Sequence, residues 1–378
     1  MSKLGIGFGT TVLGRGLATS GIDGIGGYTK SLLDCLVTDP GLDICPFAFG
    51  SGGLLPKGMV SHRLPRFSMG SLSSLLLGKS YSGSQSLSRR VDVIHATDHL
   101  IPRITGVPVV ATLMDAIPLA HPEWVNYRFA TLKNSIWRKT AGFADHVITI
   151  SEYSKEELIR FFGLSDSKIS VVPLGVDGRW FAKPTAEQLR TVRVRYRLPK
   201  NFLVFVGTLQ PRKNVTRIID AHRSLPAATR ASYPLLLIGR AGWQCAEIDD
   251  QLRVDDRQVQ WLNYVPGEDL PVILRCASGL VFPSLHEGFG LPVLEAFAAE
   301  LPVITSCITS LPEVAGNAAL LVDPYCCEQI AWAMQQIIDD AALVSRLRRE
   351  GLSRAREFTW ARTTQATIEI YRRLVACR

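Results

Sequence analysis

The stretch SGLVFPSLHEGFGLPVLEAFAAELPVITS, residues 278–306, decides the fold class. Apolar runs at 278–284 and 301–306 flank a segment that opens with a glycine-rich turn and continues with helix-forming residues. Near-continuous hydrophobic runs that are joined through a helix are typical of parallel strands covered on both faces. The stretch therefore predicts a strand–helix–strand unit of an α/β fold.

The same alternation extends from this unit in both directions and forms two series. In the C-terminal series, strands are expected at 201–209, 233–239, 258–265, 278–284, 301–306 and 318–324. In the N-terminal series, strands are expected at 4–10, 91–95, 107–113, 145–150 and 168–173. Helices are expected at 27–37, 152–162, 214–223, 326–339, 341–357 and from Thr359 onward, and 174–200 is interpreted as a connector. Two Rossmann-like, doubly wound parallel-sheet domains follow from this pattern.

Length and composition agree with a globular protein of this kind. The chain has 378 residues, of which 47% are hydrophobic and 20% charged, which excludes a disordered, collagen-like or coiled-coil chain. No window of about 18 uncharged apolar residues and no signal pattern is found. We therefore expect a cytoplasmic protein.

The charge balance indicates anionic partners. Lys and Arg number 42 against 34 acidic residues, a net charge of +8 that favours nucleotides, phosphate groups or an anionic membrane surface. Nucleic acid is not expected, because zinc-finger spacing and RNP-type aromatic patterns are missing. The eight cysteines form no C-x-x-C pair, so neither a zinc ribbon nor a redox motif is predicted.

The strongest local signal is the glycine-rich turn HEGFGLPVLEA at 286–296. Gly288 and Gly290 let backbone N–H groups approach a ligand, and the helix that follows favours negative charge at its N-terminus. Glu287 and Glu295 bracket this turn, and carboxylates accept hydrogen bonds from vicinal hydroxyls. The turn predicts a phosphate site with two sugar-binding carboxylates, against the alternative of a dipole-compensating and a solvated glutamate.

A second signal is GTLQPRKN at 207–214, between a buried strand and a helix. Arg212 and Lys213 stand where the carboxyl end of a strand meets a ligand crevice. Cations at a helix N-terminus are unfavourable unless an anion offsets them, so this pair predicts a diphosphate site rather than an exposed basic turn.

A third, weaker signal is GIDGIGGY at 21–28. It fails as a dinucleotide fingerprint, because the third glycine would fall on Thr29 and the loop after Thr10 is too long for a tight phosphate turn. Gly26 and Gly27 still allow close backbone approach, although a flexible loop explains them equally well.

A basic, leucine-bearing stretch occupies 57–90. No acidic residue lies between Asp43 and Asp92, whereas SLSSLLLGKSY at 71–81 is surrounded by basic residues. The basic residues are Lys57, Arg63, Arg66, Lys79, Arg89 and Arg90. The composition fits a surface that docks on anionic lipid and equally a solvated loop.

Motifs along essentially the whole chain resemble those of the retaining family 4 glycosyltransferases of the GT-B fold. The resemblance rests on ADHVITISEYSKEEL (144–158), ISVVPLGVD (169–177), GTLQPRKN (207–214), EGFGLPVLEA (287–296), SLPEVAGNAALLVDP (310–324) and FTWARTTQATIEIY (358–371). Within the family, the sequence is similar to bacterial mannosyl- and rhamnosyltransferases of lipopolysaccharide O-antigen or exopolysaccharide synthesis.

The resemblance implies two domains that face across a cleft. The N-terminal, acceptor-binding domain would span 1–176, with the last helix, about 361–378, packed back on it. The C-terminal, nucleotide-sugar-binding domain would span 177–360.

The resemblance also implies a reaction. A hexose, with mannose or rhamnose favoured, would move from a GDP-sugar to a hydroxyl of a polyprenyl-linked or lipid A-core-linked saccharide, with retention at the anomeric carbon. Neither a metal nor another cofactor is expected. Peripheral contact with the inner face of the plasma membrane through 57–90 would bring the enzyme to a lipid-linked acceptor.

The family's site residues can be carried over where the motifs match. Glu287 would contact the donor sugar and Glu295 the ribose, while Arg212 and Lys213 would hold the diphosphate. Backbone groups of Gly288, Phe289, Gly290 and Leu291 would help to bind the diphosphate. Gly26 and Gly27 would contact the phosphates or the acceptor, and the backbone of Tyr264 and Val265 would contact the base.

One position departs from the family pattern. Family members often have His-Asp after the strand that corresponds to 107–113, whereas this chain has Met114 and Asp115. Asp115 remains a candidate to orient the acceptor hydroxyl. Substitutes for the missing histidine lie nearby in sequence at His95, His99 and His121, although a lone histidine beside a strand end is more often structural.

Several other functions remain as alternatives. A UDP-hexose-dependent transferase, an epimerase or a phosphorylase would use the same fold. A NAD-dependent oxidoreductase fits two Rossmann-like halves but not the failed fingerprint. A non-catalytic nucleotide-sugar-binding subunit of a polysaccharide assembly complex is motivated by Met114 and the basic stretch.

Overall fold

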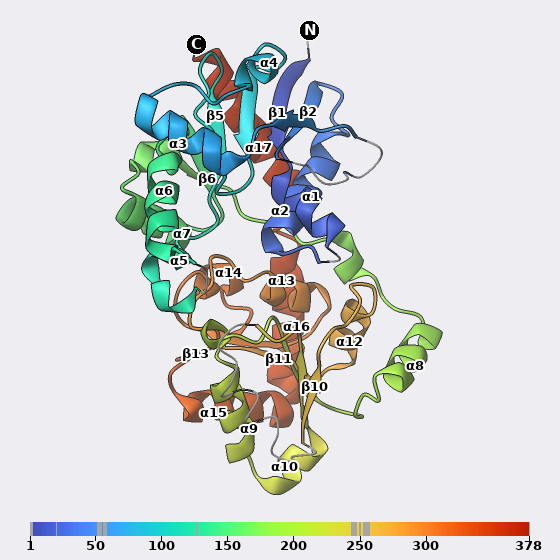
Figure 1. The fold of residues 1–378 in the computed structure, drawn as a ribbon. Helices are drawn as coiled ribbons and strands as arrows, with labels where there is room; N and C mark the ends of the chain where they lie inside the picture. The colour runs from blue at the N-terminus through green and yellow to red at the C-terminus, as the bar shows by residue number, and fades with distance from the viewer. Residues whose placement is uncertain are drawn as a thin grey trace. The chain divides into compact units, whose positions relative to one another are not determined.

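The computed structural model forms two compact units (Figure 1). It describes residues 3–19, 21–50, 55, 59–125, 128–242, 248, 251 and 258–377. Unit 1 consists of Met1–Gly175 together with Trp360–Arg378, and unit 2 consists of Val176–Thr359. The C-terminal helix therefore belongs to the first unit.

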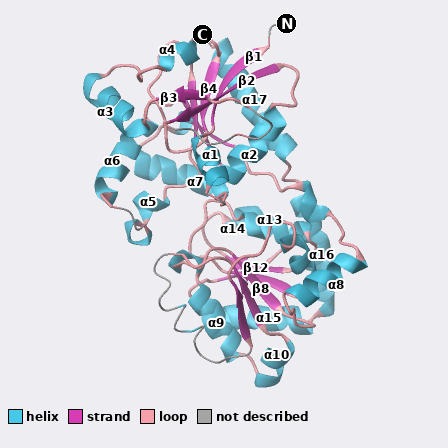
Figure 2. Cartoon of the chain, turned by 45° about the vertical axis from the view of Figure 1, so that its right-hand side comes forward, coloured by secondary structure: helices cyan, strands magenta, loops and turns pink. Residues whose placement is uncertain are grey.

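Unit 1 is built on a parallel sheet flanked by helices (Figure 2). Its strands are β1 (Leu4–Gly9), β2 (Leu42–Phe49), β3 (His62–Leu64), β4 (Val93–Ala96), β5 (Val109–Thr112), β6 (His146–Thr149) and β7 (Ile169–Val171). They pair in the order β3-β2-β1-β4-β5-β6-β7. Its helices and helical turns are α1 (Thr11–Ala18), α2 (Gly24–Leu36), α3 (Phe67–Leu77), α4 (Ser84–Ser88), α5 (Ile117–Ala120), η2 (Pro122–Trp124), α6 (Ala130–Ala141), α7 (Glu152–Glu157), η3 (Leu158–Phe162), η4 (Asp166–Lys168) and α17 (Trp360–Ala376).

Unit 2 repeats this architecture. Its strands are β8 (Leu203–Val206), β9 (Leu235–Ile238), β10 (Val259–Leu262), β11 (Gly279–Phe282), β12 (Val303–Ser306) and β13 (Leu320–Val322). They pair in parallel in the order β10-β9-β8-β11-β12-β13. Its helices and helical turns are η5 (Gly178–Phe181), α8 (Ala186–Arg195), η6 (Pro211–Lys213), α9 (Val215–Ser224), α10 (Ala227–Ser232), α12 (Leu270–Cys276), α13 (Leu291–Ala298), α14 (Leu311–Ala315), α15 (Cys327–Asp339) and α16 (Ala341–Ala355).

The prediction of two parallel, helix-flanked sheets is confirmed. The central strands are buried at nearly every position, which is why they stand out as continuous apolar runs. The sequence-based prediction missed β2 and β3. The strand β2 contains Pro46 and β3 has only three residues at the sheet edge, so neither gives a long β-branched run.

The predicted long loop after Thr10 is wrong, because Thr11–Ala18 is helix α1. Gly14 and Gly16 lower its helix propensity by about 1 kcal/mol each relative to Ala, and packing of its buried face outweighs that cost. The alternative interpretation of Gly26 and Gly27 as a flexible loop is also wrong. Gly26 and Gly27 form the first turn of α2, because Asp23 caps the helix and accepts from the Gly26 N–H at 2.7 Å.

The connector interpretation of 174–200 misses two elements, η5 and α8. Helix α8 begins at a capping box, in which the Thr185 hydroxyl accepts from the Gln188 N–H and the Gln188 side chain accepts from the Thr185 N–H. The T-x-x-Q pattern of residues 185–188 was the available signal.

A buried polar network ties the C-terminal helix into unit 1. The Tyr371 hydroxyl on α17 lies 2.6 Å from His95 Nδ1 on β4, and His95 Nε2 lies 2.8 Å from the Thr112 hydroxyl. The Thr112 hydroxyl lies 2.8 Å from the hydroxyl of Tyr28 on α2. Burial lowers the pKa of His95 to about 3, so the ring is neutral at pH 7 and joins the helix to the sheet by hydrogen bonds.

Removing one member of this network should destabilise the protein. Tyr371→Phe keeps the ring but leaves buried His95 Nδ1 without its partner, which costs about 1–3 kcal/mol. We expect a lower thermal midpoint in circular dichroism. Tyr325→Phe is the control, because Tyr325 is 59% exposed. Equal midpoints for the two variants would show that the network adds no stability.

Candidate active site

The predicted diphosphate residues lie at the point where the strand order of unit 2 reverses. Strand β8 pairs with β9 on one side and with β11 on the other. Loops that follow two such strands leave in opposite directions and open a ligand crevice at the carboxyl ends. Arg212 and Lys213 follow β8, and Glu287 follows β11.

The structure brings these three side chains into direct contact. Lys213 Nζ donates to Glu287 Oε1 at 2.5 Å, and Arg212 Nη1 donates to Glu287 Oε2 at 2.9 Å. Arg212 Nη1 also donates to the carbonyl of His286 at 3.0 Å. We call Arg212, Lys213 and Glu287 the ion cluster. Lys213 and Glu287 are both buried.

The ion cluster holds one net positive charge. Burial by itself raises the pKa of the Glu287 carboxyl, but the charges of Lys213 and Arg212 outweigh burial and hold that pKa at about 2. Glu287 is therefore ionised at pH 7, and each of its oxygens already accepts one hydrogen bond. Its remaining lone pairs can accept from hydroxyl groups. Two cations against one carboxylate leave this turn suited to an anion.

Asn214 fixes the turn that carries the two cations, a role that sequence reasoning missed. Its backbone is left-handed, with φ of 61°. Its Nδ2 donates to the carbonyl of Pro283 at 2.9 Å and to that of Pro324 at 2.6 Å. The loop after β8 is thus tied to the ends of β11 and β13. An N at the end of the motif PRKN was the only signal, since asparagine is enriched in left-handed turns.

Hydrogen bonds from Ser310 fix the backbone of the glycine-rich turn. The Ser310 hydroxyl lies 2.8 Å from the carbonyl of Glu287 and 3.0 Å from that of Phe289. Gly290 precedes α13 with φ of 108°, and a Cβ there would lie 2.6 Å from Leu311 Cδ2. Phe289 itself is buried and packs edge-on against Phe358, so its side chain is part of the core. A ligand at this turn would meet the backbone.

Glu295 lies within α13 and is partly buried. Burial raises the pKa of its carboxyl to about 7, although the charge of Arg179 lowers it. Arg179 belongs to η5, in the segment interpreted as a connector. The structure therefore adds a basic residue beside the predicted ribose carboxylate.

Tyr264 and Val265 follow β10, at the edge of the sheet of unit 2. Val265 is buried, whereas Tyr264 is 59% exposed. The guanidinium of Arg240 lies 4.7 Å from the centre of the Tyr264 ring. Within the described part of the chain, no hydrogen bond or ion pair joins Tyr264 or Val265 to the ion cluster, so their place at a base-binding site stays a prediction.

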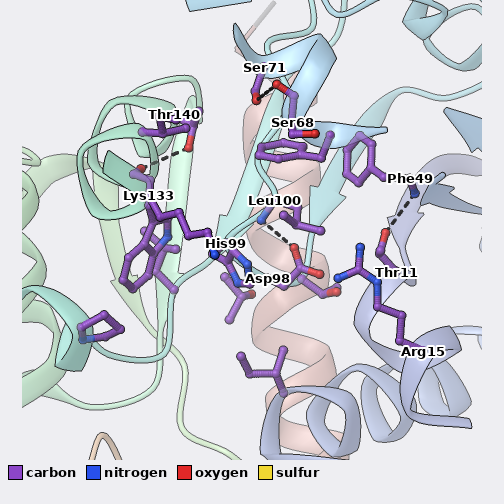
Figure 3. Close-up of a pocket in the computed structure, with 18 of the residues that line it drawn as sticks. Thr11, Arg15, Phe49, Ser68, Ser71, Asp98, His99, Leu100, Lys133 and Thr140 are labelled. Carbon is purple, nitrogen blue, oxygen red and sulfur yellow. Dashed lines mark hydrogen bonds between the residues drawn. The ribbon is translucent and has the colours of Figure 1, made fainter. Parts of the chain in front are cut away.

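Asp115 lies in unit 1 and, together with Met114, lines a cavity of about 910 Å³. Figure 3 shows other residues that line this cavity, among them Asp98 and His99. Gly26 and Gly27 do not line it. Their backbone N–H groups donate to the side chain and carbonyl of Asp23, at 2.7 and 2.8 Å. These two amides are therefore engaged within the helix, and their phosphate or acceptor role stays a prediction.

The three histidines near Met114 differ in their surroundings. His95 belongs to the buried network described above and is structural. His121 stacks on Trp124 with ring centres 3.9 Å apart. His99 lines the cavity beside Met114 and is exposed, so it is the histidine of the three that shares the cavity.

The basic stretch at 57–90 contains helix α3, which buries small and polar residues and exposes most of its leucines. Among its described residues, Gly70, Ser71 and Ser74 are buried, whereas three of its four leucines are exposed and Leu75 is partly buried. Leu72, Leu76 and Leu77 are 51%, 74% and 65% exposed. The basic side chains Arg63, Arg66, Lys79, Arg89 and Arg90 are also exposed, and Lys57 lies outside the described residues.

Among the residues that the structure describes, no three His, Cys, Asp or Glu side chains are grouped so that they could hold a metal ion. None of the described helices has the length and apolar character needed to cross a membrane.

The raised pKa of Glu295 makes stability depend on pH. Between pH about 4.5 and 7, the folded state keeps a proton that the unfolded state releases, so stability falls as pH rises through this window. Glu295→Gln has no proton to lose. We expect it to raise the thermal midpoint at pH 8 by about 2–4 °C, the effect of 1 kcal/mol in a domain of this size, and by less at pH 5.

The control for this experiment is Glu268→Gln, because Glu268 is exposed. Differential scanning calorimetry at both pH values measures the effect. An equal gain at pH 5 and pH 8 would contradict a carboxyl that is neutral at pH 5 and charged at pH 8 in the folded state.

Comparison with known proteins identifies the family. The model "Glycosyltransferase Family 4" matches residues 22–179, and "Glycosyl transferases group 1" matches 192–354. The chain is 34% identical over 261 residues to the O-antigen chain mannosyltransferase B of Escherichia coli, covering 68% of this chain and 67% of that protein. It is 30% identical over 279 residues to the serotype-specific mannosyltransferase WbdA of the same species, covering 70% of this chain and about a third (33%) of WbdA.

A solved structure supports the fold. The crystal structure of Alr3699/HepE from Anabaena, in complex with UDP and glucose, superposes with a TM-score of 0.74. The two sequences are 18% identical, and the alignment covers 98% of this chain and 99% of that chain. Two family models in tandem, an O-antigen mannosyltransferase relative and this shared architecture lead to one conclusion: the chain belongs to the family 4 glycosyltransferases with the GT-B fold.

Proposed function

We propose that the protein is a retaining hexosyltransferase that moves mannose or rhamnose from a GDP-sugar to a hydroxyl of a growing, lipid-linked cell-surface polysaccharide. The observation that carries this proposal is the ion cluster of Arg212, Lys213 and Glu287 at the strand-order reversal of unit 2. Similarity to two O-antigen-related mannosyltransferases supports the choice of sugar. The GDP donor and the lipid-linked acceptor rest on resemblance to that subgroup.

In the proposed reaction, the bond between the sugar C1 and the diphosphate oxygen breaks. The acceptor oxygen forms a bond to C1 on the same face, and its proton passes to the departing diphosphate. Arg212 and Lys213 stabilise the charge that develops on the leaving oxygen. No protein nucleophile, metal or other cofactor is required by this sequence of bonds.

The other site residues have binding roles in this proposal. Glu287 accepts hydrogen bonds from sugar hydroxyls through its remaining lone pairs, and Glu295 accepts from the ribose. Backbone N–H groups at Gly288–Leu291 face the diphosphate. Tyr264 and Val265 contact the base.

A UDP-hexose donor is the second candidate, and the UDP-bound structural neighbour favours it. Thermal stabilisation by GDP, GDP-mannose, UDP, UDP-glucose and NADH, each with EDTA, separates the candidates, because a ligand that binds only the folded state raises the unfolding midpoint. We expect a GDP-selective shift that disappears in Glu295→Ala. A UDP-selective shift would change the donor, and a shift with NADH alone would overturn the proposal.

Donor turnover should depend strongly on Lys213. Lys213→Ala removes a buried positive charge that would stabilise the departing diphosphate. We therefore expect turnover of GDP-mannose to fall at least about a hundredfold. The exposed Lys183 provides the control variant Lys183→Ala. Near wild-type turnover in a folded Lys213→Ala protein would refute the role of the ion cluster.

The exposed leucines of helix α3 support peripheral contact with an anionic membrane. Exposed leucines beside basic residues are the composition of membrane-surface segments. Helix α6, which packs against α3 (Figure 1), also exposes Leu132. In this proposal, insertion of the leucines and attraction of the basic groups to anionic lipid hold the enzyme at its acceptor.

Vesicle flotation tests the membrane contact. The triple variant Leu72→Ser, Leu76→Ser and Leu77→Ser removes three exposed apolar side chains, each of which contributes about 1.5–3 kcal/mol when fully buried. We expect at least about a tenfold loss of binding to phosphatidylglycerol vesicles. Val194→Ser on α8 is the control, because Val194 is 74% exposed. Undiminished flotation of the triple variant would rule out α3 as the contact.

A further inference from the structure

Unit 1 has a strand-order reversal of its own. Strand β1 pairs with β2 on one side and with β4 on the other. The cavity of about 910 Å³ is lined by residues that follow these two strands, together with residues of α3 and α6. Small-molecule sites span about 300–1,000 Å³, so the cavity is large enough for a ligand of more than one sugar ring.

Asp98 stands at this reversal, two residues after β4. It is 5% exposed and lines the cavity. Its Oδ1 accepts from the Leu100 N–H at 2.7 Å, and the neighbouring Thr97 hydroxyl donates to the carbonyl of Gly9 at 2.8 Å. These bonds fix the loop and the orientation of the carboxyl group. Its Oδ2 has no hydrogen bond to any residue within the described ranges.

The surroundings of Asp98 favour a ligand that donates hydrogen bonds without carrying a negative charge. Arg15 of α1 points toward Asp98 in Figure 3, and its charge, like that of His99, opposes the rise in the pKa of Asp98 that burial causes. A hydroxyl group satisfies a buried carboxylate oxygen without adding charge. Trp137 and Phe49 add aromatic faces to the cavity wall. Hydroxyl groups on a partly apolar ring are the chemistry of a saccharide.

Asp115 fits this role less well, although it lines the same cavity. It is partly buried, and its Oδ1 accepts from the Ile117 N–H at 3.1 Å, at the start of helix α5. Asp98 combines deeper burial with an oxygen that has no hydrogen-bond partner among the described residues.

We infer that Asp98 binds the saccharide acceptor in the cavity of unit 1, by accepting a hydrogen bond at Oδ2 from an acceptor hydroxyl. The inference rests on the proposed transferase function and adds an acceptor-binding residue to it. Asp98 accepts a hydrogen bond and not the proton, which leaves with the diphosphate. The residue therefore contributes to acceptor affinity and orientation and not to donor binding.

Asp98→Asn tests the inference, because the amide oxygen can keep the bond to Leu100 while the amide nitrogen cannot accept. Transfer from GDP-mannose to octyl glycosides of mannose, rhamnose and N-acetylglucosamine identifies the fastest wild-type acceptor, which serves as the probe. We expect kcat/KM for that acceptor to fall about 10- to 100-fold, the effect of leaving one buried polar group unsatisfied. Acceptor-independent hydrolysis of GDP-mannose and stabilisation by GDP should change less than about twofold.

Two further variants sharpen the test. Asp34→Asn removes a carboxylate from α2, where Asp34 pairs with Lys30 at 2.7 Å, and should leave transfer unchanged. Asp98→Glu keeps the charge that Arg15 faces but displaces it by one methylene, and should show the same acceptor-specific loss. This variant decides the question if Asp98→Asn does not fold.

The outcomes separate the two claims. Unchanged acceptor kcat/KM in the Asp98 variants would overturn the inference and leave the transferase function standing. Equal losses of transfer, hydrolysis and GDP stabilisation would overturn it as well, because Asp98 would then be a structural residue. Failure of the wild-type protein to glycosylate any of the acceptors would overturn the proposed function and, with it, the inference.

Discussion

The pairing of the buried side chains of Lys213 and Glu287 with each other and with the partly buried Arg212 is the constraint on which the site in unit 2 depends. A buried charge is costly unless it is paired and hydrogen-bonded. Glu287 meets that requirement for both Lys213 and Arg212, while Asn214 and Ser310 hold the two loops that carry them. Because two cations share one carboxylate, each charged group has a partner of opposite charge, and the ion cluster still carries a net positive charge. An anion such as a diphosphate offsets that charge.

The two units share a topology in which the strand order of a parallel sheet reverses. In each, the segments that follow the two strands at the reversal carry a cation and a carboxylate. Unit 2 places Arg212 against Glu287 in direct contact, whereas unit 1 has Arg15 pointing toward Asp98. The contact in unit 2 uses both carboxylate oxygens. In unit 1, Asp98 Oδ2 has no hydrogen bond to any of the described residues, so it can accept one from a neutral ligand that carries hydroxyl groups.

Sequence patterns predicted the strands that have continuous apolar runs and missed β2 and β3. Strands such as β8 and β11 are apolar throughout, whereas the three-residue edge strand β3 carries no pattern. The predicted diphosphate turn stood out in the sequence because two cations at a helix start are unfavourable unless an anion offsets them. Asp98 did not stand out in the sequence, because a single acidic residue after a strand has no distinctive spacing. Its side chain becomes buried only when β1 and β4 pair. Gly26 was assigned to a loop because the capping role of Asp23 was overlooked.

Calorimetric titration with GDP and GMP, both in EDTA, tests most directly whether the ion cluster recognises a diphosphate. The two ligands differ by one phosphate group, which Arg212 and Lys213 would hold. The account predicts that the wild-type protein binds GDP at least about tenfold more tightly than GMP, a difference of about 1.4 kcal/mol, and that Arg212→Ala loses most of that preference. Equal affinity of the wild-type protein for both nucleotides would contradict the central claim.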